Sequence, residues 1–183
     1  MKKWFLLFTC VLSACSIVDK PSTSIKSFMI YSEQKLPEAH HKKSVSINVV
    51  SDVPNNRPYI KITEQQMDFL ADSEWFEPLD KMIARSFIHS FQNAGVTTFN
   101  GINSTAQSYV KIHVRHFGLE YVPGKKVMRV TYFVEVMDHA RGTVLKSKIF
   151  EHTNDHLWIS DQDYIKTLNS LHQELIKEIY LWI

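Results

Sequence analysis

Histidine is the residue type in this chain best suited to acid–base or metal chemistry, and the chain carries nine of them. His113 and His116 lie three residues apart in a strand-like segment, where strict alternation points their side chains to opposite faces. His152 and His156 have the spacing of two ligands on a helix, but Thr153-Asn154-Asp155 between them is typical of a loop. We therefore expect neither a metal site nor a cofactor.

The motifs that place a nucleophile or a phosphate group are absent from the sequence. No serine lies in a Gly-x-Ser-x-Gly elbow, and neither a Walker A sequence nor Gly-x-Gly-x-x-Gly occurs. Five glycines leave little material for a phosphate-binding loop. Two carboxylates brought together by the fold stay an open alternative, because such a pair leaves no local pattern. The sequence favours a protein that is not an enzyme, and we expect no catalytic residues.

Cys15 is the candidate for covalent modification. Two lysines and an apolar run over residues 4–12 precede Leu12-Ser13-Ala14-Cys15, which is the order of a secretory signal too short to span a membrane. The cysteine after Leu-Ser-Ala resembles the lipobox of bacterial lipoproteins. This implies that residues 1–14 are a signal peptide and that Cys15 becomes a diacylated N-terminus. The alternative is an ordinary secretory signal cut near Ala14.

The rest of the chain divides into a tether and a domain. Residues 15–25 are mostly polar and show no period, which predicts a lipidated N-terminus followed by a tether. Residues 26–183 suit one domain with a core of its own. Ser16 stands where aspartate would be more typical of inner-membrane retention. By analogy with lipoproteins it favours a lipid-anchored protein of the outer membrane that faces the periplasm.

Charge and cysteine content exclude some classes of partner and of cross-link. Without Lys2 and Lys3 the chain carries 19 basic and 19 acidic residues, whereas nucleic-acid binders show a basic excess. We therefore expect no nucleic-acid partner. Cys15 is the only cysteine beyond the signal, which excludes disulfides within the domain and thiolate metal sites.

Alternating apolar residues predict a sheet. In the middle of the chain, Pro123-Gly124 and Arg141-Gly142 separate three strand-like runs by short links, as in an antiparallel meander. The expected strands are residues 28–31, 45–49, 59–62, 110–117, 128–136 and 144–150.

Two amphipathic helices complete the expected fold. The first starts near Trp75–Pro78 and ends at Gly95, and the second starts after Ser160 with Asp163 in a capping box. Each apolar stripe needs a sheet face to cover. We predict an α/β fold of the α+β kind, with two layers: a mixed, mostly antiparallel sheet and two long helices packed on one face. The stripes are Leu79, Met82, Ile83, Phe87, Phe91 and Ala94, and then Ile165, Leu168, His172, Leu175, Ile179 and Trp182.

Two short segments carry a family resemblance. Arg57-Pro58-Tyr59-Ile60, followed by Trp75-Phe76-Glu77-Pro78-Leu79 at a helix start, resembles the ABC-type transport auxiliary lipoprotein family. That family includes the lipoprotein of the paraquat-inducible intermembrane transport system. The likeness extends from the lipobox to the last helix, which ends at Trp182. Its motif residues here are Arg57, Pro58, Ile60, Trp75, Pro78 and Leu79. We expect Trp75 to be buried where the first helix meets the sheet; the alternative is a surface tryptophan that binds a partner.

The resemblance implies a non-catalytic outer-membrane lipoprotein that works beside an ABC permease, its ATPase and a substrate-binding MCE (mammalian cell entry) protein. Such systems move lipids between the inner and outer membranes, with phospholipids as the expected cargo. Direct binding of phospholipid and a homo-oligomeric state both stay open. Trp158 and Ile159, an apolar pair between acidic residues, are the expected contact surface. The alternative is a structural lipoprotein that scaffolds another envelope or secretion complex.

Overall fold

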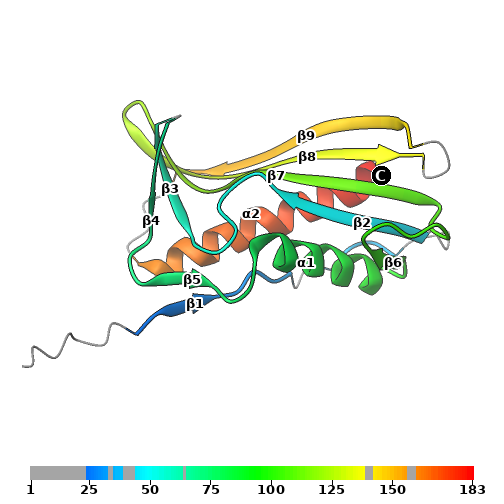
Figure 1. Cartoon of the computed structure of the whole chain (residues 1–183), viewed down its shortest axis with the longest axis horizontal. Helices are drawn as coiled ribbons and strands as arrows, with labels where there is room; N and C mark the ends of the chain where they lie inside the picture. The colour runs from blue at the N-terminus through cyan, green and yellow to red at the C-terminus, as the bar shows by residue number, and fades with distance from the viewer. Residues whose placement is uncertain (1–23, 33–34, 39–43, 64, 139–141, 156–159) are drawn as a thin grey trace, which may run out of the picture.

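A computed structural model of the chain describes residues 24–32, 35–38, 44–63, 65–138, 142–155 and 160–183. Two helices, α1 (Leu79–Asn93) and α2 (Asp161–Trp182), lie on one face of a mixed sheet (Figure 1). Seven strands form this sheet, and two short strands form a second one. The longest ladders are antiparallel. The predicted fold class is therefore confirmed.

Strand β7 (Ser108–Val122) organises the large sheet. One of its edges pairs antiparallel with β8 (Lys125–Met137), which pairs in turn with β9 (Val144–Asn154), so the predicted meander is confirmed. Its other edge takes two parallel partners in succession, first β2 and then β3. The remaining strands are β2 (Ser44–Ser51), β3 (Tyr59–Thr63), β4 (Gln66–Phe69) and β6 (Thr97–Asn100), with β1 (Lys26–Phe28) and β5 (Ser73–Trp75) in the small parallel sheet.

A β-bulge in β7 corrects the expected directions of two histidines. The pairing with β8 shifts between Val114 and His116, so that Arg115 is the extra residue. His113 pairs with Phe133 and His116 with Thr131, two residues apart in β8. Both histidines therefore lie on the face of the sheet that is turned away from the helices, which we call the outer face. Strict alternation had placed them on opposite faces.

Both helices bury the predicted apolar stripes against the inner face. Every predicted stripe residue of the two helices is buried except Trp182, which is partly buried. α1 begins at Leu79, and Trp75 belongs to the preceding strand β5. Gly95, at a φ of 84°, follows the end of α1, and its N–H donates to the Gln92 carbonyl. Ser160 accepts a hydrogen bond from the Asp163 N–H, which confirms the predicted start of α2.

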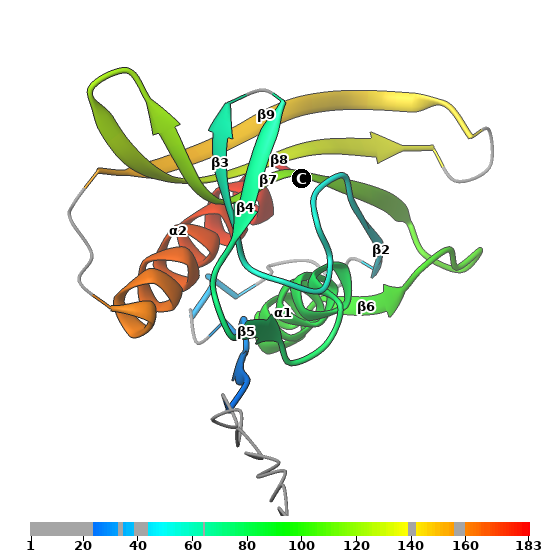
Figure 2. The ribbon, with the colours of Figure 1, turned by 60° about the vertical axis from the view of Figure 1, so that its left-hand side comes forward.

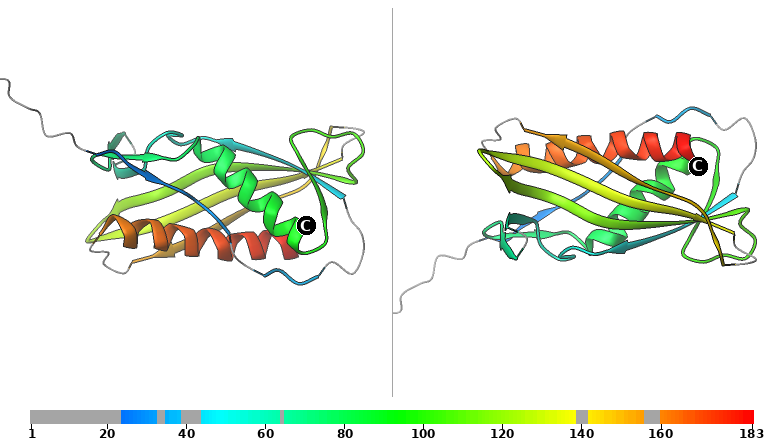
Figure 3. Two further views of the ribbon diagram at one scale, coloured as in Figure 1. Left: turned by 90° about the horizontal axis from the view of Figure 1, so that it is seen from below. Right: turned by 90° about the horizontal axis from the view of Figure 1, so that it is seen from above.

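The N-terminal segment runs across the helices on the side away from the sheet (Figure 3). Ile30 and Leu36 enter the core, at 4% and 8% exposure. Asn169 of α2 holds the segment in place, because its Oδ1 accepts from the Tyr31 N–H at 3.2 Å and its Nδ2 donates to the Met29 carbonyl. The expected strand over residues 28–31 is thus a strand only as far as Phe28.

Strand β9 is joined to α2 by polar side chains. His152 Nε2 lies 2.6 Å from the Glu178 carboxylate, and His152 Nδ1 lies 3.2 Å from that of Glu174. Lys146 Nζ donates to the Trp182 carbonyl at 2.6 Å and lies 4.4 Å from the centre of its indole ring. The paired carboxylates explain His152 as a structural residue. His156 lies outside the described residues.

A polar chain crosses the centre of the core. His172 of α2 is fully buried, with Nδ1 2.8 Å from the Tyr132 hydroxyl of β8 and Nε2 2.9 Å from the Ser86 hydroxyl of α1. A neutral imidazole has one donor and one acceptor nitrogen, and each hydroxyl can serve as either. Burial lowers the pKa of His172 to about 3, so the ring stays neutral at physiological pH.

Replacing Trp75 tests the packing where β5 meets β7. The Trp75 side chain is 4% exposed, as predicted for a core residue. Its ring packs edge-on against the Phe117 ring, with 6.0 Å between the ring centres. We expect Trp75→Ala to lower the free energy of unfolding by about 3–5 kcal/mol in urea titrations. Trp75→Phe should cost much less, because Trp75 Nε1 has no hydrogen-bond partner among the described residues. An unchanged stability in Trp75→Ala would assign the indole to partner binding instead.

The buried histidines make stability depend on pH. Burial lowers the pKa of His116 to about 4 and that of His172 to about 3, from 6.5 for a free histidine. Between pH 6.5 and pH 4 the unfolded chain therefore binds protons that the folded chain does not. Each histidine should lower the free energy of unfolding by about 1.4 kcal/mol per pH unit as the solution is acidified.

Urea titrations across that range measure the effect. His172→Gln should flatten the dependence relative to the unsubstituted protein, because the buried imidazole is gone. An unchanged slope in this variant would show that His172 is not one of the titrating groups.

Candidate functional site

The structure brings the two segments of the family resemblance together. The residues before β3 lie against β5 and the start of α1, so that Arg57 and Trp75 belong to one junction. Cys15, Trp158 and Ile159 lie outside the described residues, and their roles stay predictions. The junction residues are Arg57, Pro58, Ile60, Trp75, Pro78 and Leu79.

Arg57 holds the junction through backbone carbonyls. Its Nε donates to the Ser73 carbonyl at 3.3 Å and its Nη2 to the Leu70 carbonyl at 3.1 Å. The guanidinium also lies 5.1 Å from the centre of the Phe69 ring. Trp75 adds a bond from its N–H to the Asn56 carbonyl at 3.0 Å. These contacts use the donors of Arg57 inside the molecule, which makes Arg57 a structural residue.

Asn55 caps α1 from outside the helix, and sequence reasoning missed this role. Pro78 at the N-cap makes no side-chain capping bond. Instead the Leu79 N–H donates to the Asn55 carbonyl at 2.8 Å, and the Asp80 N–H donates to Asn55 Oδ1 at 2.9 Å. Asn55 Nδ2 returns a bond to Asp80 Oδ1. The only sequence signal was a turn at Pro54-Asn55-Asn56, which does not reveal what the turn contacts.

A pocket of about 370 Å³ opens between α1, β2 and β6. Glu77 and Arg85 face each other across its wall, with Nη1–Oε1 and Nη2–Oε2 distances of 2.6 and 2.7 Å. Asp80 is held by Asn55, so both acidic side chains of the pocket already have partners. Lys81, Asn48 and Asn100 are the further polar groups of its lining. The pocket is therefore a surface hollow beside a structural ion pair.

A cluster of paired charges lies on the outer face where β3 joins β7. Glu120 lies between Lys61 Nζ at 3.3 Å and Arg129 Nε at 2.9 Å. Glu151 lies 3.6 Å from Arg129 Nη1 and accepts a hydrogen bond from the Thr131 hydroxyl at 2.9 Å. Two cations and two carboxylates balance one another, so the fold does bring carboxylates near each other but neutralises both. The cluster joins four strands, β3, β7, β8 and β9.

His116 lies beside this cluster under the Tyr59 ring, 5.5 Å away between ring centres. It is 7% exposed, and its Nε2 has no hydrogen-bond partner among the described residues. Burial lowers its pKa to about 4, against the opposing field of Glu120, so the ring is neutral. Gly118 lets the Tyr59 carbonyl approach closely here, because a Cβ at this position would lie 2.8 Å from that oxygen. The close packing leaves no path for a substrate.

The serine, histidine and tyrosine of the core are also closed to substrates. Ser86 is 4% exposed, and His172 and Tyr132 are fully buried. Within the described residues, no three histidine, cysteine, aspartate or glutamate side chains are arranged to hold a metal ion. The groups that resemble a catalytic or metal site thus hold the fold together.

Among the described residues, no helix lies on the outer face of the sheet. Figure 2 shows the long strands above both helices, with the β3–β4 hairpin standing steeply beside them. Across this face Val50, His113, Phe133 and Ile149 stand opposite one another on four neighbouring strands. Val50 is 37% and Ile149 54% exposed. The Arg115 guanidinium lies over the Phe133 ring at 4.5 Å. We call these four residues the outer-face row.

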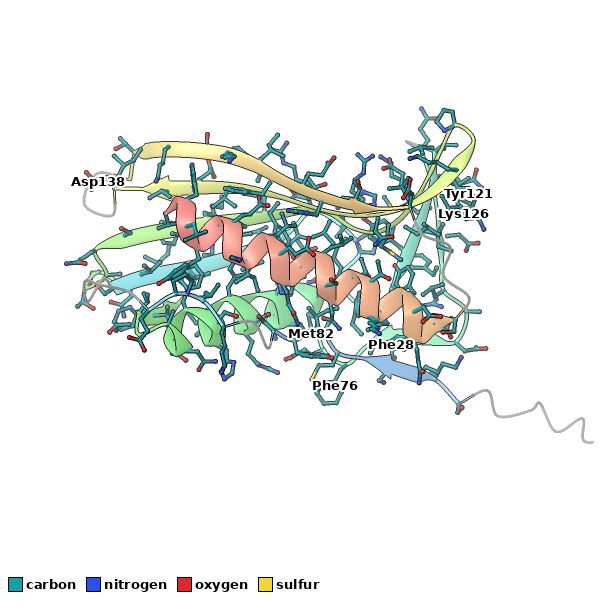
Figure 4. All side chains as sticks on the ribbon, turned by 180° about the vertical axis from the view of Figure 1, so that it is seen from behind. Phe28, Phe76, Met82, Tyr121, Lys126 and Asp138 are labelled. Carbon is teal, nitrogen blue, oxygen red and sulfur yellow. The ribbon has the colours of Figure 1, made fainter. Side chains whose placement is uncertain are left out.

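Two carboxylates flank the histidine of the outer-face row. His113 Nε2 lies 3.4 Å from the Glu135 carboxylate, and His113 Nδ1 lies 3.8 Å from that of Asp52. An apolar centre with a polar rim is the usual composition of a protein interface. Figure 4 shows the two ends of the strands, with Tyr121 and Lys126 at the β7–β8 turn and Asp138 at the other end of β8.

Comparison with known proteins bears on the fold. No protein-family model and no curated protein sequence matches the chain. The crystal structure of protein XCC0632 from Xanthomonas campestris, described with the family model DUF330, is similar with a TM-score of 0.72 and 12% identity, over 86% of this chain and 94% of that one. The hypothetical protein CT253 from Chlamydia trachomatis is similar with a TM-score of 0.52 and 11% identity, over 77% and 95%.

A looser likeness is to lipoprotein GNA1162 from Neisseria meningitidis, with a TM-score of 0.41 and 12% identity over 75% of this chain and 98% of that one, which is too distant to carry an argument. Neither XCC0632 nor CT253 is described by an enzymatic activity. At these identities the likenesses to XCC0632 and CT253 show a shared fold, and membership of the ABC-type transport auxiliary lipoprotein family stays a prediction.

Proposed function

We propose that the protein is a non-catalytic lipoprotein of the outer membrane that assists an ABC- and MCE-type system in moving lipids, foremost phospholipids, between the two membranes. The observation that carries the proposal is the contrast between the two faces of the sheet. The helices cover the inner face, whereas the outer face presents the apolar side chains of Val50, Phe133 and Ile149 next to charged groups. This exposed face supports a function in binding other proteins.

The anchor supports the same proposal. Among the described residues no helix combines the length and the apolar run that crossing a bilayer requires. The lipobox at Cys15 supplies an attachment instead, and two or more acyl chains hold a protein firmly at a membrane. The anchored domain then offers its outer face to an MCE protein or a permease.

The anchor is tested by replacing Cys15. We expect Cys15→Ser to leave the protein unprocessed or to release it from the membrane fraction, because the sulfur atom that carries the lipid is gone. Mass spectrometry of the mature N-terminus measures the modification directly. An unmodified Cys15 at the mature N-terminus would contradict the lipoprotein assignment, and a cut elsewhere near Ala14 would support an ordinary secretory signal.

The partner is tested with photo-crosslinking residues in cells. A probe at Ile149, in the outer-face row, should capture an MCE protein or a permease component, and so should a probe at Trp158 if that residue is part of the contact. The control is Gln92, an exposed residue on α1. Deletion of the gene should also sensitise the outer membrane to detergents.

The same experiment separates the two functions. Capture of a secretion apparatus, together with an unchanged lipid distribution between the membranes in the deletion strain, would replace lipid transport by the scaffold function. Equal capture from Ile149 and Gln92 would show that the outer face is not the contact surface.

A further inference from the structure

We propose that Ile25, Met29, Tyr31 and Phe76, which we call the anchor-side patch, lie against the membrane surface and insert their apolar side chains among the lipid headgroups. The proposal rests on the proposed lipid anchor at Cys15. It assigns to these residues a second, non-covalent contact with the bilayer, and thereby an orientation of the whole domain.

Strand pairing places Met29 beside Phe76. In the small parallel sheet Phe28 stands opposite Trp75, and the Phe76 N–H donates to the Phe28 carbonyl at 2.8 Å. Met29 directly follows β1, and Phe76 directly follows β5. Since Phe28 and Trp75 pack against the core, the following side chains point outward.

The same alternation continues along the N-terminal segment. Ile30 is buried, whereas Ile25, Met29 and Tyr31 on the other side are 63%, 46% and 48% exposed. Phe76 is 61% exposed, and Figure 4 shows it projecting from the body of the molecule beyond Phe28. A single exposed apolar residue is ordinary on a protein surface. Here four exposed apolar residues form a patch, because the strand pair and the segment that follows it bring them to one side of the molecule.

The short distance along the chain between Cys15 and the patch indicates that the membrane is what the patch contacts. Cys15 precedes Ile25 by ten residues, which span at most about 36 Å when fully extended. A lipid-anchored domain is therefore held close to the bilayer, and the described chain begins at Ser24, directly before Ile25 of the patch. Amphipathic surfaces of this kind bury apolar side chains about 5–10 Å into the boundary between headgroups and acyl chains.

Two charged groups beside the patch have polar partners. Lys26 Nζ lies 2.7 Å from the Asp161 carboxylate, and the Glu74 carboxylate accepts a hydrogen bond from the Ser27 hydroxyl at 3.2 Å. The ion pair lowers the cost of bringing the Lys26 ammonium group to the headgroup region. The patch and the N-terminal segment lie on the helix side of the sheet (Figure 3). Contact with the membrane on that side directs the outer-face row toward the periplasm.

The test uses the lipidated protein and single cysteines. Because Cys15 is the only cysteine beyond the signal and its sulfur carries lipid in the proposed anchor, a cysteine introduced elsewhere can be labelled alone. Phe76→Cys and Met29→Cys receive a polarity-sensitive fluorophore, and the protein is reconstituted in vesicles of phosphatidylethanolamine and phosphatidylglycerol that contain a shallow nitroxide lipid. The control is Ile102→Cys, 74% exposed, in the connection that follows β6 at the other end of the molecule (Figure 1).

We expect a blue shift and strong quenching at positions 76 and 29, and weak quenching at position 102. Weak quenching at all three positions, in protein that floats with the vesicles, would overturn the patch and leave the anchor intact. Protein that carries no lipid and does not float would overturn the anchor, and the patch with it. Thermal unfolding of each labelled variant checks that the domain stays folded.

Discussion

The imidazole of His172 is the point on which the arrangement of the inner layer depends. It joins β8, α1 and α2 through two hydrogen bonds, and each of these elements supplies one of the three polar groups. A buried polar atom without a partner is costly, so neither helix can shift along the sheet without losing one of these bonds. Phe87, Phe117 and Tyr132 surround the ring edge-on, with centres 5.7 to 6.1 Å away, and exclude water from it. The group that resembles a catalytic histidine is thereby sealed into a structural role.

The two segments of the family resemblance also have a structural role. Arg57 binds the carbonyls of the chain that leads to Trp75, and Asn55 supplies the cap that Pro78 does not provide. These residues fix the positions of β3, β5 and α1 relative to one another. Their types therefore reflect how the chain folds, and they say little about which protein it meets. The contact surface that we propose lies at other positions, on the outer face.

Much of the fold could be predicted because period and length are local signals. The helices and the meander each extend over enough residues for apolar alternation to stand out. Strands β4, β5 and β6 were missed, since each has three or four residues and two of them pair at a sheet edge. The bulge at Arg115 did leave a signal, because the apolar alternation changes there from even positions, ending at Val114, to odd positions, beginning at Phe117. The prediction of strict alternation through His116 overlooked this change.

The candidate site was harder to predict than the fold. Val50, Phe133 and Ile149 are far apart in the sequence and meet only through strand register. The charge cluster of Lys61, Glu120, Arg129 and Glu151 likewise draws on four strands. A single sequence carries no signal for such pairs. Trp158 and Ile159 were chosen for composition alone and lie outside the described residues.

The lysines of β9 affect how two copies of the protein can meet at the open edge of the sheet. Within the described residues β9 pairs only with β8, which leaves its other edge open. Lys146 and Lys148 lie on this strand, with their ammonium groups over the Trp182 and Phe150 rings. Molecules fixed to one leaflet meet by diffusion in two dimensions, where open strand edges would otherwise join into aggregates. Charges on an edge strand oppose that joining, so in the proposed lipid-anchored state these lysines would work against edge-to-edge pairing of β9 between neighbouring copies.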